Sequence, residues 1–174
     1  INSFMTRLAP RPGAWNIRQI TFMFYYTNYY SRIHHATESS YFYITPFEFE
    51  FNGGERLEYR LRPRFERLFE PFEIHDGVAI PEGDYSFFQH EVSYHGPTNK
   101  SRFYDVNYRA GSFYSGQSNE LSTMFVWRKS SQLNTSFELQ QYWVRLKEGD
   151  FNTRLALVRF NYSFSPYITL SNFV

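Results

Sequence analysis

The sequence predicts an all-β fold, an antiparallel up-and-down meander of about nine strands that forms part of a transmembrane, outer-membrane-type β-barrel. Three observations predict it. Polar and apolar side chains alternate with a period of two in nearly every segment, which is the period of a strand. The connections between these runs alternate between short and long, as they do in outer-membrane barrels. Most runs hold 12 to 16 residues, and a tilted membrane-crossing strand needs roughly 9–11.

The alternating runs give the strands in order, and the segments between them give the connections. Gly53 and Gly54 predict a two-residue hairpin turn, because the turns that suit hairpins need a positive φ. All short connections should lie at one end of the sheet and all long ones at the other. The short connections are 53–54, 96–100, 129–131 and 165–166, and the long ones are 31–37, 71–83, 114–116 and 145–150. The expected strands are 15–30, 38–52, 55–70, 84–95, 101–113, 117–128, 132–144, 151–164 and a truncated 167–174.

The segment 56–66 separates its side chains most completely, with charged residues at every even position and uncharged ones at every odd position. A strand turns successive side chains to opposite faces. An arginine that faces lipid at mid-membrane costs roughly 2–4 kcal/mol, so the charged face should line the lumen. The expected lumen-facing charged row is Arg56, Glu58, Arg60, Arg62, Arg64, Glu66, Glu48, Glu50, Glu138 and Arg159. The expected lipid-facing residues are Leu57, Tyr59, Leu61, Phe65, Phe47, Phe49, Phe137, Leu139, Val158 and Phe160.

Aromatic residues make up 22% of the 174 residues and crowd the ends of the strands, which predicts the two aromatic belts of a membrane barrel. The belt at the long-connection end would hold Tyr25, Tyr26, Tyr29, Tyr30, Tyr41, Tyr43, Tyr85, Phe113, Tyr114, Trp143 and Phe151. The belt at the short-turn end would hold Trp15, Phe51, Tyr94, Phe103, Trp127, Tyr162 and Tyr167.

Composition excludes several other classes. So many rings exclude a disordered chain, and the longest apolar run, 22–26, is far too short for a membrane helix. A net charge of +1 gives no reason to expect nucleic acid as a partner. The absence of cysteine excludes disulfides, thiolate nucleophiles and thiolate metal sites.

Alternation alone leaves open which face of the sheet is the inner one. A soluble lipocalin-like barrel that binds a small apolar ligand has a similar number of strands in a similar length. In that barrel the rings would line the pocket and the arginine row would face water. A soluble two-sheet sandwich is a further alternative. Inside a membrane barrel, the arginine row would either favour anionic solutes or sugars, or form a wall neutralised by Glu48, Glu50, Glu58 and Glu66.

Several segments carry a resemblance to a known family. They include residues 11–19, 77–85, 113–116, 148–151 and 161–166, and the most specific is Phe65-Glu66-Arg67-Leu68-Phe69-Glu70-Pro71-Phe72-Glu73-Ile74. Together they resemble the C-terminal barrel region of a large bacterial family of unknown function. The members of that family carry an N-terminal β-sandwich similar to carbohydrate-binding module family nine. The resemblance covers the chain from about residue 10 to 174 and implies a Gram-negative outer-membrane protein that is carbohydrate-related.

The two ends of the sequence suggest a segment of a longer chain. It opens without an initiator methionine and closes in the middle of an expected strand. We therefore expect residues 1–174 to be one segment of a larger barrel domain, without the sandwich and without the last strands. The expected partners are outer-membrane lipid and, through the absent sandwich, carbohydrate. Such a segment should form an open, curved sheet whose first and last strands keep unpaired edges.

No motif predicts catalysis, a cofactor or a metal. The repeated Glu82-Gly83-Asp84 and Glu148-Gly149-Asp150 each end a long connection, and they predict turns in which glycine takes a positive φ and aspartate closes onto the backbone. A weaker interpretation is a calcium or lipid-headgroup site in the outer loops. The five histidines do not form a ligand set, and we expect no enzyme in this segment. A hydrolase linked to carbohydrate through the absent domain is the remaining alternative for the full-length protein.

Overall fold

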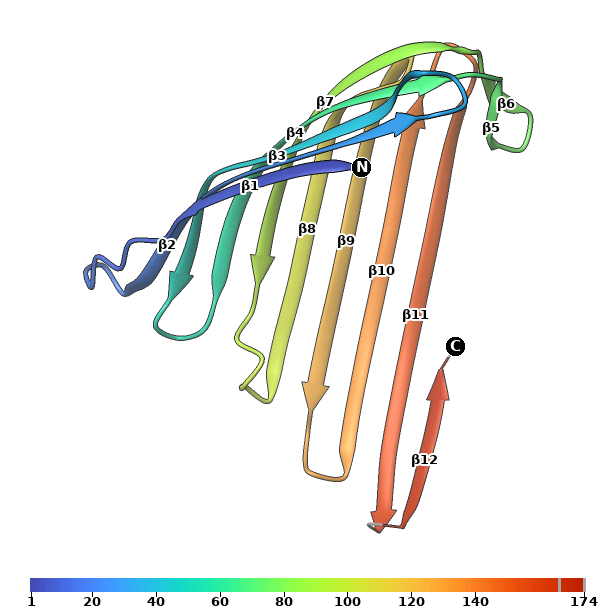
Figure 1. The fold of residues 1–174 in the computed structure, drawn as a ribbon. Coiled ribbons are helices and arrows are strands. Elements are labelled where there is room, and N and C mark those ends of the chain that lie inside the picture. The colour runs from blue at the N-terminus through green and yellow to red at the C-terminus, as the bar shows by residue number, and fades with distance from the viewer. Residues whose placement is uncertain (166, 174) are drawn as a thin grey trace.

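The computed structural model describes residues 1–165 and 167–173, and strands make up the regular structure of this part of the chain. Within it, no helix is long and apolar enough to cross a membrane. Figure 1 shows the strands in order. They are β1 (Asn2–Leu8), β2 (Ile17–Ser31), β3 (Ala36–Phe51), β4 (Arg56–Leu68), β5 (Phe72–His75), β6 (Val78–Ile80), β7 (Gly83–His95), β8 (Arg102–Phe113), β9 (Gly116–Arg128), β10 (Leu133–Arg145), β11 (Asp150–Ser165) and β12 (Ile168–Phe173).

Ten of these strands form one antiparallel sheet in the order β1-β2-β3-β4-β7-β8-β9-β10-β11-β12, and β5 and β6 pair separately as a hairpin. The predicted all-β meander is therefore confirmed. The sheet has one strand more than the sequence predicts, because β1 pairs along its whole length with β2, from Asn2 opposite Asn28 to Leu8 opposite Phe22. Every residue of β1 is exposed, so no buried face imposes an alternating pattern by which the strand could be recognised.

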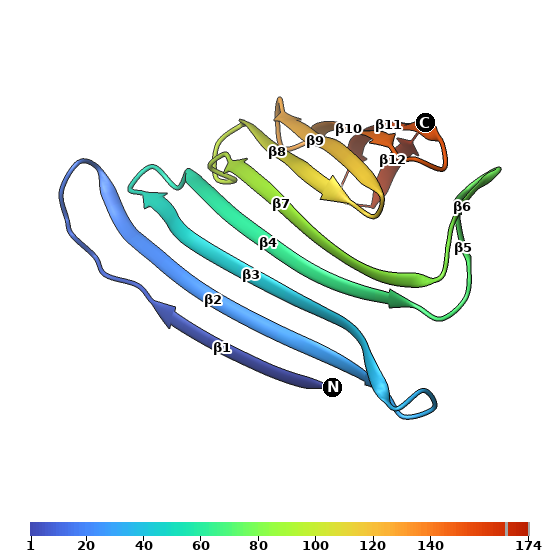
Figure 2. The ribbon, with the colours of Figure 1, turned by 90° about the horizontal axis from the view of Figure 1, so that it is seen from above.

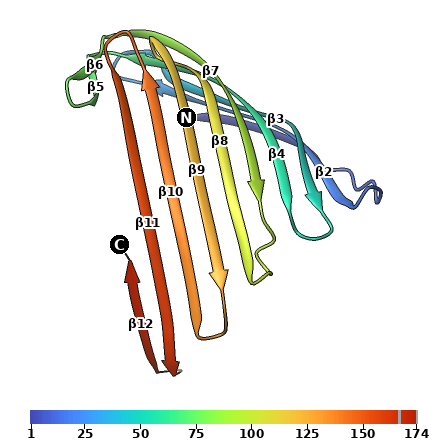
Figure 3. The same ribbon diagram turned by 180° about the vertical axis from the view of Figure 1, so that it is seen from behind.

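The predicted connections separate to the two ends of the sheet (Figures 1 and 3). The β1–β2 connection, residues 9–16, is long but lies at the short-turn end. Two differ in detail. The β3–β4 turn is a three-residue loop, closed by the Phe51 N–H donating to the Glu55 carbonyl over 2.9 Å, with Gly54 at a φ of 94°. The connection at Tyr114 is a tight two-residue turn and not a long one, since Phe113 pairs with Gly116. Pro166 in the predicted 165–166 turn lies outside the described residues.

The sheet is curved and open. Figure 2 shows β1 and β12 at opposite ends of the curve, and the strand order does not bring them together. The expectation of an open sheet with two free edges is confirmed.

Burial distinguishes the two faces of the sheet. Along β7 the buried residues Phe87, Gln89, Glu91 and Ser93 alternate with more exposed neighbours. Over most of its area the sheet has no second layer, so this burial comes from the side chains of neighbouring strands on the same face. We call the face that carries Glu91 the inner face and the opposite one the outer face.

The β5–β6 hairpin covers the inner face at the long-connection end. Val78 and Ile80 pack with Val144 and Leu146 to form the apolar cluster of the described chain, and rings such as Phe113 surround it. The side chain of Ile80 is fully buried. The hairpin therefore covers part of the inner face at this end of the sheet.

Replacing Ile80 by alanine should lower the free energy of unfolding by about 2–5 kcal/mol, because the cavity left behind adds to the lost transfer energy. Denaturant unfolding followed by circular dichroism measures this loss. Ile33 is 86% exposed, so Ile33→Ala is the matched control and should cost less than about 0.5 kcal/mol. Equal losses for the two variants would show that the hairpin does not stabilise the fold.

Candidate functional site

The strand register places the ten residues of the predicted charged row on the inner face. The six on β4 share that face, and Glu48 and Glu50 stand directly opposite Glu58 and Arg56. Direct cross-strand pairs continue the face from Arg60 to Glu91, Arg109, Glu120 and Tyr142. Glu138 is two residues from Ser136, which pairs with Arg159. The same registers place the ten predicted lipid-facing residues on the outer face.

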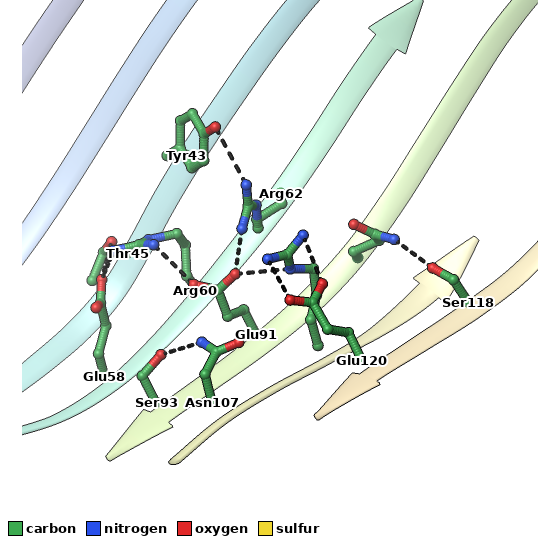
Figure 4. Close-up of polar contacts among 12 residues, drawn as sticks. Tyr43, Thr45, Glu58, Arg60, Arg62, Glu91, Ser93, Asn107, Ser118 and Glu120 are labelled. Carbon is green, nitrogen blue, oxygen red and sulfur yellow. Dashed lines mark hydrogen bonds and ion pairs between the residues drawn. The ribbon is translucent and has the colours of Figure 1, made fainter. Parts of the chain in front are cut away.

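A group of ion pairs lies at the centre of the inner face (Figure 4). The Glu91 carboxylate accepts hydrogen bonds from three arginines: Arg60 over 2.9 Å, Arg109 over 3.1 Å, and Arg62. The Glu91 side chain is only 5% exposed. One buried carboxylate therefore holds three guanidinium groups that come from β4 and β8.

Two further glutamates complete this group. Glu58 pairs with Arg60 and accepts a hydrogen bond from the Thr45 hydroxyl over 3.3 Å. Glu120 pairs with Arg109 over 3.2 Å. The group thus connects β4, β7, β8 and β9, with Thr45 bonded to it from β3, and its three negative charges balance its three positive ones. We call it the Glu91 cluster: Glu58, Arg60, Arg62, Glu91, Arg109 and Glu120.

The tyrosines of β3 extend the cluster toward the long-connection end. The Arg62 guanidinium lies 4.8 Å from the centre of the Tyr43 ring and donates to its hydroxyl over 3.3 Å. Arg64 lies 4.4 Å from the Tyr41 ring and donates to its hydroxyl over 3.1 Å. Each arginine therefore fixes both the ring and the hydroxyl of one tyrosine.

A last member of this network lies beyond the strands. The Tyr114 hydroxyl donates to Glu66 over 3.2 Å, and Glu66 is 3.6 Å from Arg64. Burial, and then the negative charge of Glu66, raise the pKa of Tyr114 well above its usual range. The hydroxyl consequently keeps its proton and remains a donor to Glu66.

The sequence predicts only part of this site. Of the glutamates expected to neutralise the row, Glu58 and Glu66 contact its arginines, and Glu50 pairs with Arg18 instead. Glu91, the central carboxylate, is absent from the predicted row, as are Arg109 and Glu120. The alternation along 84–95 places Glu91 on the polar face of its strand, but the residues that stand opposite Glu91 on the neighbouring strands are known only from the register.

The outer face carries most of the large exposed apolar residues of the sheet. Phe88, Val92, Tyr104, Phe125 and Val158 are each between 41% and 53% exposed. Polar groups there pair with one another, since the Tyr59 hydroxyl meets His90 Nδ1 at 2.7 Å and Arg154 donates to the Gln141 side chain over 2.5 Å. An apolar, ring-rich surface thus faces outward, and a charged surface faces inward.

The predicted aromatic belt at the long-connection end is wrong for most of its members. The registers put Tyr26 and Trp143 on the outer face. Seven other rings belong to the inner face, because a strand alternates its faces at the ends as well as in the middle. The seven are Tyr25, Tyr29, Tyr41, Tyr43, Tyr85, Phe113 and Phe151. At the short-turn end, Phe51, Tyr94, Trp127 and Tyr162 are on the outer face and Phe103 is on the inner face.

The two Glu-Gly-Asp motifs form strand starts. Gly83 and Gly149 have φ values of 151° and 153°, as the sequence predicts. Asp84 does not close onto the backbone; it binds Arg67 through two hydrogen bonds of 2.5 and 2.6 Å. Glu148 accepts a hydrogen bond from the Ser115 hydroxyl. Across the described residues, no three histidine, aspartate or glutamate side chains gather as a metal site would require.

Comparisons of this chain with protein-family models, with curated proteins and with solved structures found no match. The family resemblance drawn from the sequence therefore stays a prediction. The features from which function can be argued are those of the chain itself: a curved antiparallel sheet with a buried, charged inner face and an exposed, ring-rich outer face.

Proposed function

We propose that this chain is a segment of a transmembrane β-barrel of the bacterial outer membrane, with its outer face against lipid and its inner face lining a polar lumen. The observation that carries the proposal is the distribution of side chains between the faces. Glu58 and Glu91 are 5% and 4% exposed on the inner face, whereas Phe88 and Val92 on the outer face are 42% and 45% exposed. A protein folded in water buries its rings and exposes its carboxylates.

Solvent explains this inverted arrangement. Apolar side chains lose nothing against lipid, whereas an arginine facing the bilayer centre costs roughly 2–4 kcal/mol. The Glu91 cluster satisfies its charges internally, which a wet lumen tolerates. The soluble lipocalin-like alternative requires an apolar inner face, and the centre of this inner face carries charged side chains. That alternative is therefore the weaker one.

The two free edges support a larger barrel. In an open sheet, β1 and β12 each keep one edge whose backbone donors and acceptors have no partner strand, and such groups cannot stay unpaired in lipid. We propose that further strands complete the barrel and that the family resemblance applies, with a carbohydrate-binding sandwich elsewhere in the full-length protein. In that protein the barrel is a pore or an anchor.

Fluorescence quenching by brominated lipids tests the membrane placement. Trp127 and Trp143 lie on the outer face near opposite ends of the sheet. The Trp15→Phe variant is refolded into lipid vesicles, so that emission comes from Trp127 and Trp143. Lipids brominated near the headgroup should quench this emission more than lipids brominated at the ends of their acyl chains.

A neighbouring position supplies the control. Tyr142 is on the inner face beside Trp143. A variant whose sole tryptophan is introduced by Tyr142→Trp should be quenched by aqueous iodide and weakly by brominated lipid. Equal quenching by bromolipid at positions 142 and 143, or no bromolipid quenching at either position, would contradict the membrane proposal.

A further inference from the structure

A shallow hollow on the inner face of β2 and β3 has a lining of one chemical kind. Its volume is about 400 Å³, and its lining residues are Tyr25, Thr27, Tyr29, Ser39, Tyr41 and Tyr43. Every one of them carries a hydroxyl group. The lining therefore offers aromatic ring surface and hydroxyl groups together, without a charged side chain.

The register explains why these residues meet. Tyr25 stands directly opposite Tyr43, Thr27 opposite Tyr41, and Tyr29 opposite Ser39. The ring centres of Tyr25 and Tyr43 are 5.8 Å apart, and those of Tyr29 and Tyr41 are 5.9 Å apart in an edge-to-face arrangement. The four rings thus form two contacting pairs, each of which spans the two strands.

Two of the rings are held in place by arginines of the neighbouring strand β4. Tyr41 and Tyr43 accept hydrogen bonds from Arg64 and Arg62, so each hydroxyl keeps its own proton free to donate. The hydroxyls of Tyr25, Tyr29 and Ser39 form no hydrogen bond with the part of the chain that the structure describes. The hollow therefore offers a ligand two kinds of hydroxyl: those of Tyr41 and Tyr43, which arginines hold in place, and those of Tyr25, Tyr29 and Ser39, which make no other hydrogen bond with the described residues.

We propose that this hollow binds an uncharged saccharide. Sugar rings present apolar C–H faces, which suit aromatic side chains, and a rim of hydroxyls, which suit the donors and acceptors of this lining. A purely apolar ligand would leave those hydroxyls without partners. An anionic ligand would gain little electrostatic binding energy here, because Arg62 is already paired with Glu91 and Arg64 with Glu66.

The position of the hollow fits entry from the long-connection end. Tyr29 is two residues from the end of β2 at Ser31, and Ser39 is three residues after the start of β3 at Ala36. That the hollow opens into a lumen rests on the proposed function; that it binds saccharide does not.

Titration of the detergent-solubilised chain with maltotriose and cellotriose tests the proposal by saturation-transfer NMR. At least one should bind with a Kd on the order of 1 mM, because the hollow is shallow and open. Trigalacturonate, which is charged, should bind more weakly. Failure of both neutral sugars to bind, or tighter binding of trigalacturonate, would overturn the proposal.

Variants locate the binding. Tyr25→Ala and Tyr29→Ala should each weaken binding by roughly fivefold to tenfold, and Tyr25→Phe, which keeps the ring and the fold, by roughly threefold. Tyr26 lies on the outer face next to Tyr25, so Tyr26→Ala is the matched control and should leave the Kd unchanged. Equal weakening by Tyr26→Ala and Tyr25→Ala would overturn the assignment.

Sugar binding without bromolipid quenching would refute the membrane proposal alone, and quenching without sugar binding would refute the saccharide site alone.

Discussion

Arginine at position 158 should block insertion of the chain into lipid vesicles, and arginine at position 157 should not. The two residues are neighbours near the middle of β11, and both are aliphatic. Val158 is 43% exposed on the outer face, opposite Phe137. Leu157 is on the inner face, directly opposite Glu138. The same substitution is thus made at the same depth on opposite faces.

The expected difference follows from the solvent that each face meets. A guanidinium facing the hydrocarbon near the bilayer centre costs roughly 2–4 kcal/mol. On the inner face, the new guanidinium at position 157 meets water and the Glu138 carboxylate, and the cost is close to zero. The folded, vesicle-bound fraction of Val158→Arg should therefore fall by roughly 30-fold or more relative to Leu157→Arg.

Flotation of vesicles, followed by circular dichroism of the bound fraction, measures this difference. Val158→Thr controls for the loss of the valine side chain without adding charge. A soluble barrel with an apolar interior predicts the reverse order, with Leu157→Arg the damaging change. That reverse order would exclude the membrane assignment.

The period of two was sufficient to predict the strands and which residues share a face, because the two faces of the sheet differ in composition. In 56–66 the alternation is complete, and the register places these residues on the faces that the alternation assigns them. Sheet order also followed from sequence, since short connections join antiparallel neighbours. β1 was not predicted. Neither of its faces is buried, so its polar and apolar residues do not alternate with a period of two.

The contacts within the site could not be predicted in the same way. Alternation places Glu91 on a face, but the partners of Glu91 depend on which residue of β4 stands opposite it. Here Arg60 is opposite, and a shift of two residues would bring Arg62 or Glu58 there without changing the pattern. The aromatic rings show a second limit. The position of these rings near strand ends suggested a membrane belt. The alternation of side chains along the strands instead places Tyr25 and Tyr41 on the inner face.

Replacing Glu91 by glutamine should cause the largest loss of stability on the inner face. Its carboxylate holds Arg60, Arg62 and Arg109 and is 5% exposed. Removing one partner of a buried ion pair typically costs about 3–5 kcal/mol, because the remaining charges stay buried without compensation. Here three guanidinium groups would be left close together. Urea unfolding of the chain in detergent, followed by circular dichroism, measures the change.

An exposed pair on the same face supplies the control. The side chains of Arg159 and Glu138 are 48% and 27% exposed, and solvent-exposed ion pairs contribute about 0–1 kcal/mol. Glu138→Gln should therefore lower the free energy of unfolding by less than about 1 kcal/mol. Equal losses for the two glutamates would mean that the Glu91 cluster is as hydrated as the surface pair.

A double variant separates charge from hydrogen-bond geometry. Arg62 pairs with Glu91 and with Tyr43, whereas Arg60 and Arg109 keep Glu58 and Glu120 when Glu91 is neutralised. If the loss in Glu91→Gln comes from uncompensated positive charge, adding Arg62→Met should restore about 1–2 kcal/mol, because the remaining charges are then balanced. If the loss came only from broken hydrogen bonds, the second substitution would add to it. The sign of the coupling between positions 62 and 91 therefore decides whether charge balance stabilises the inner face.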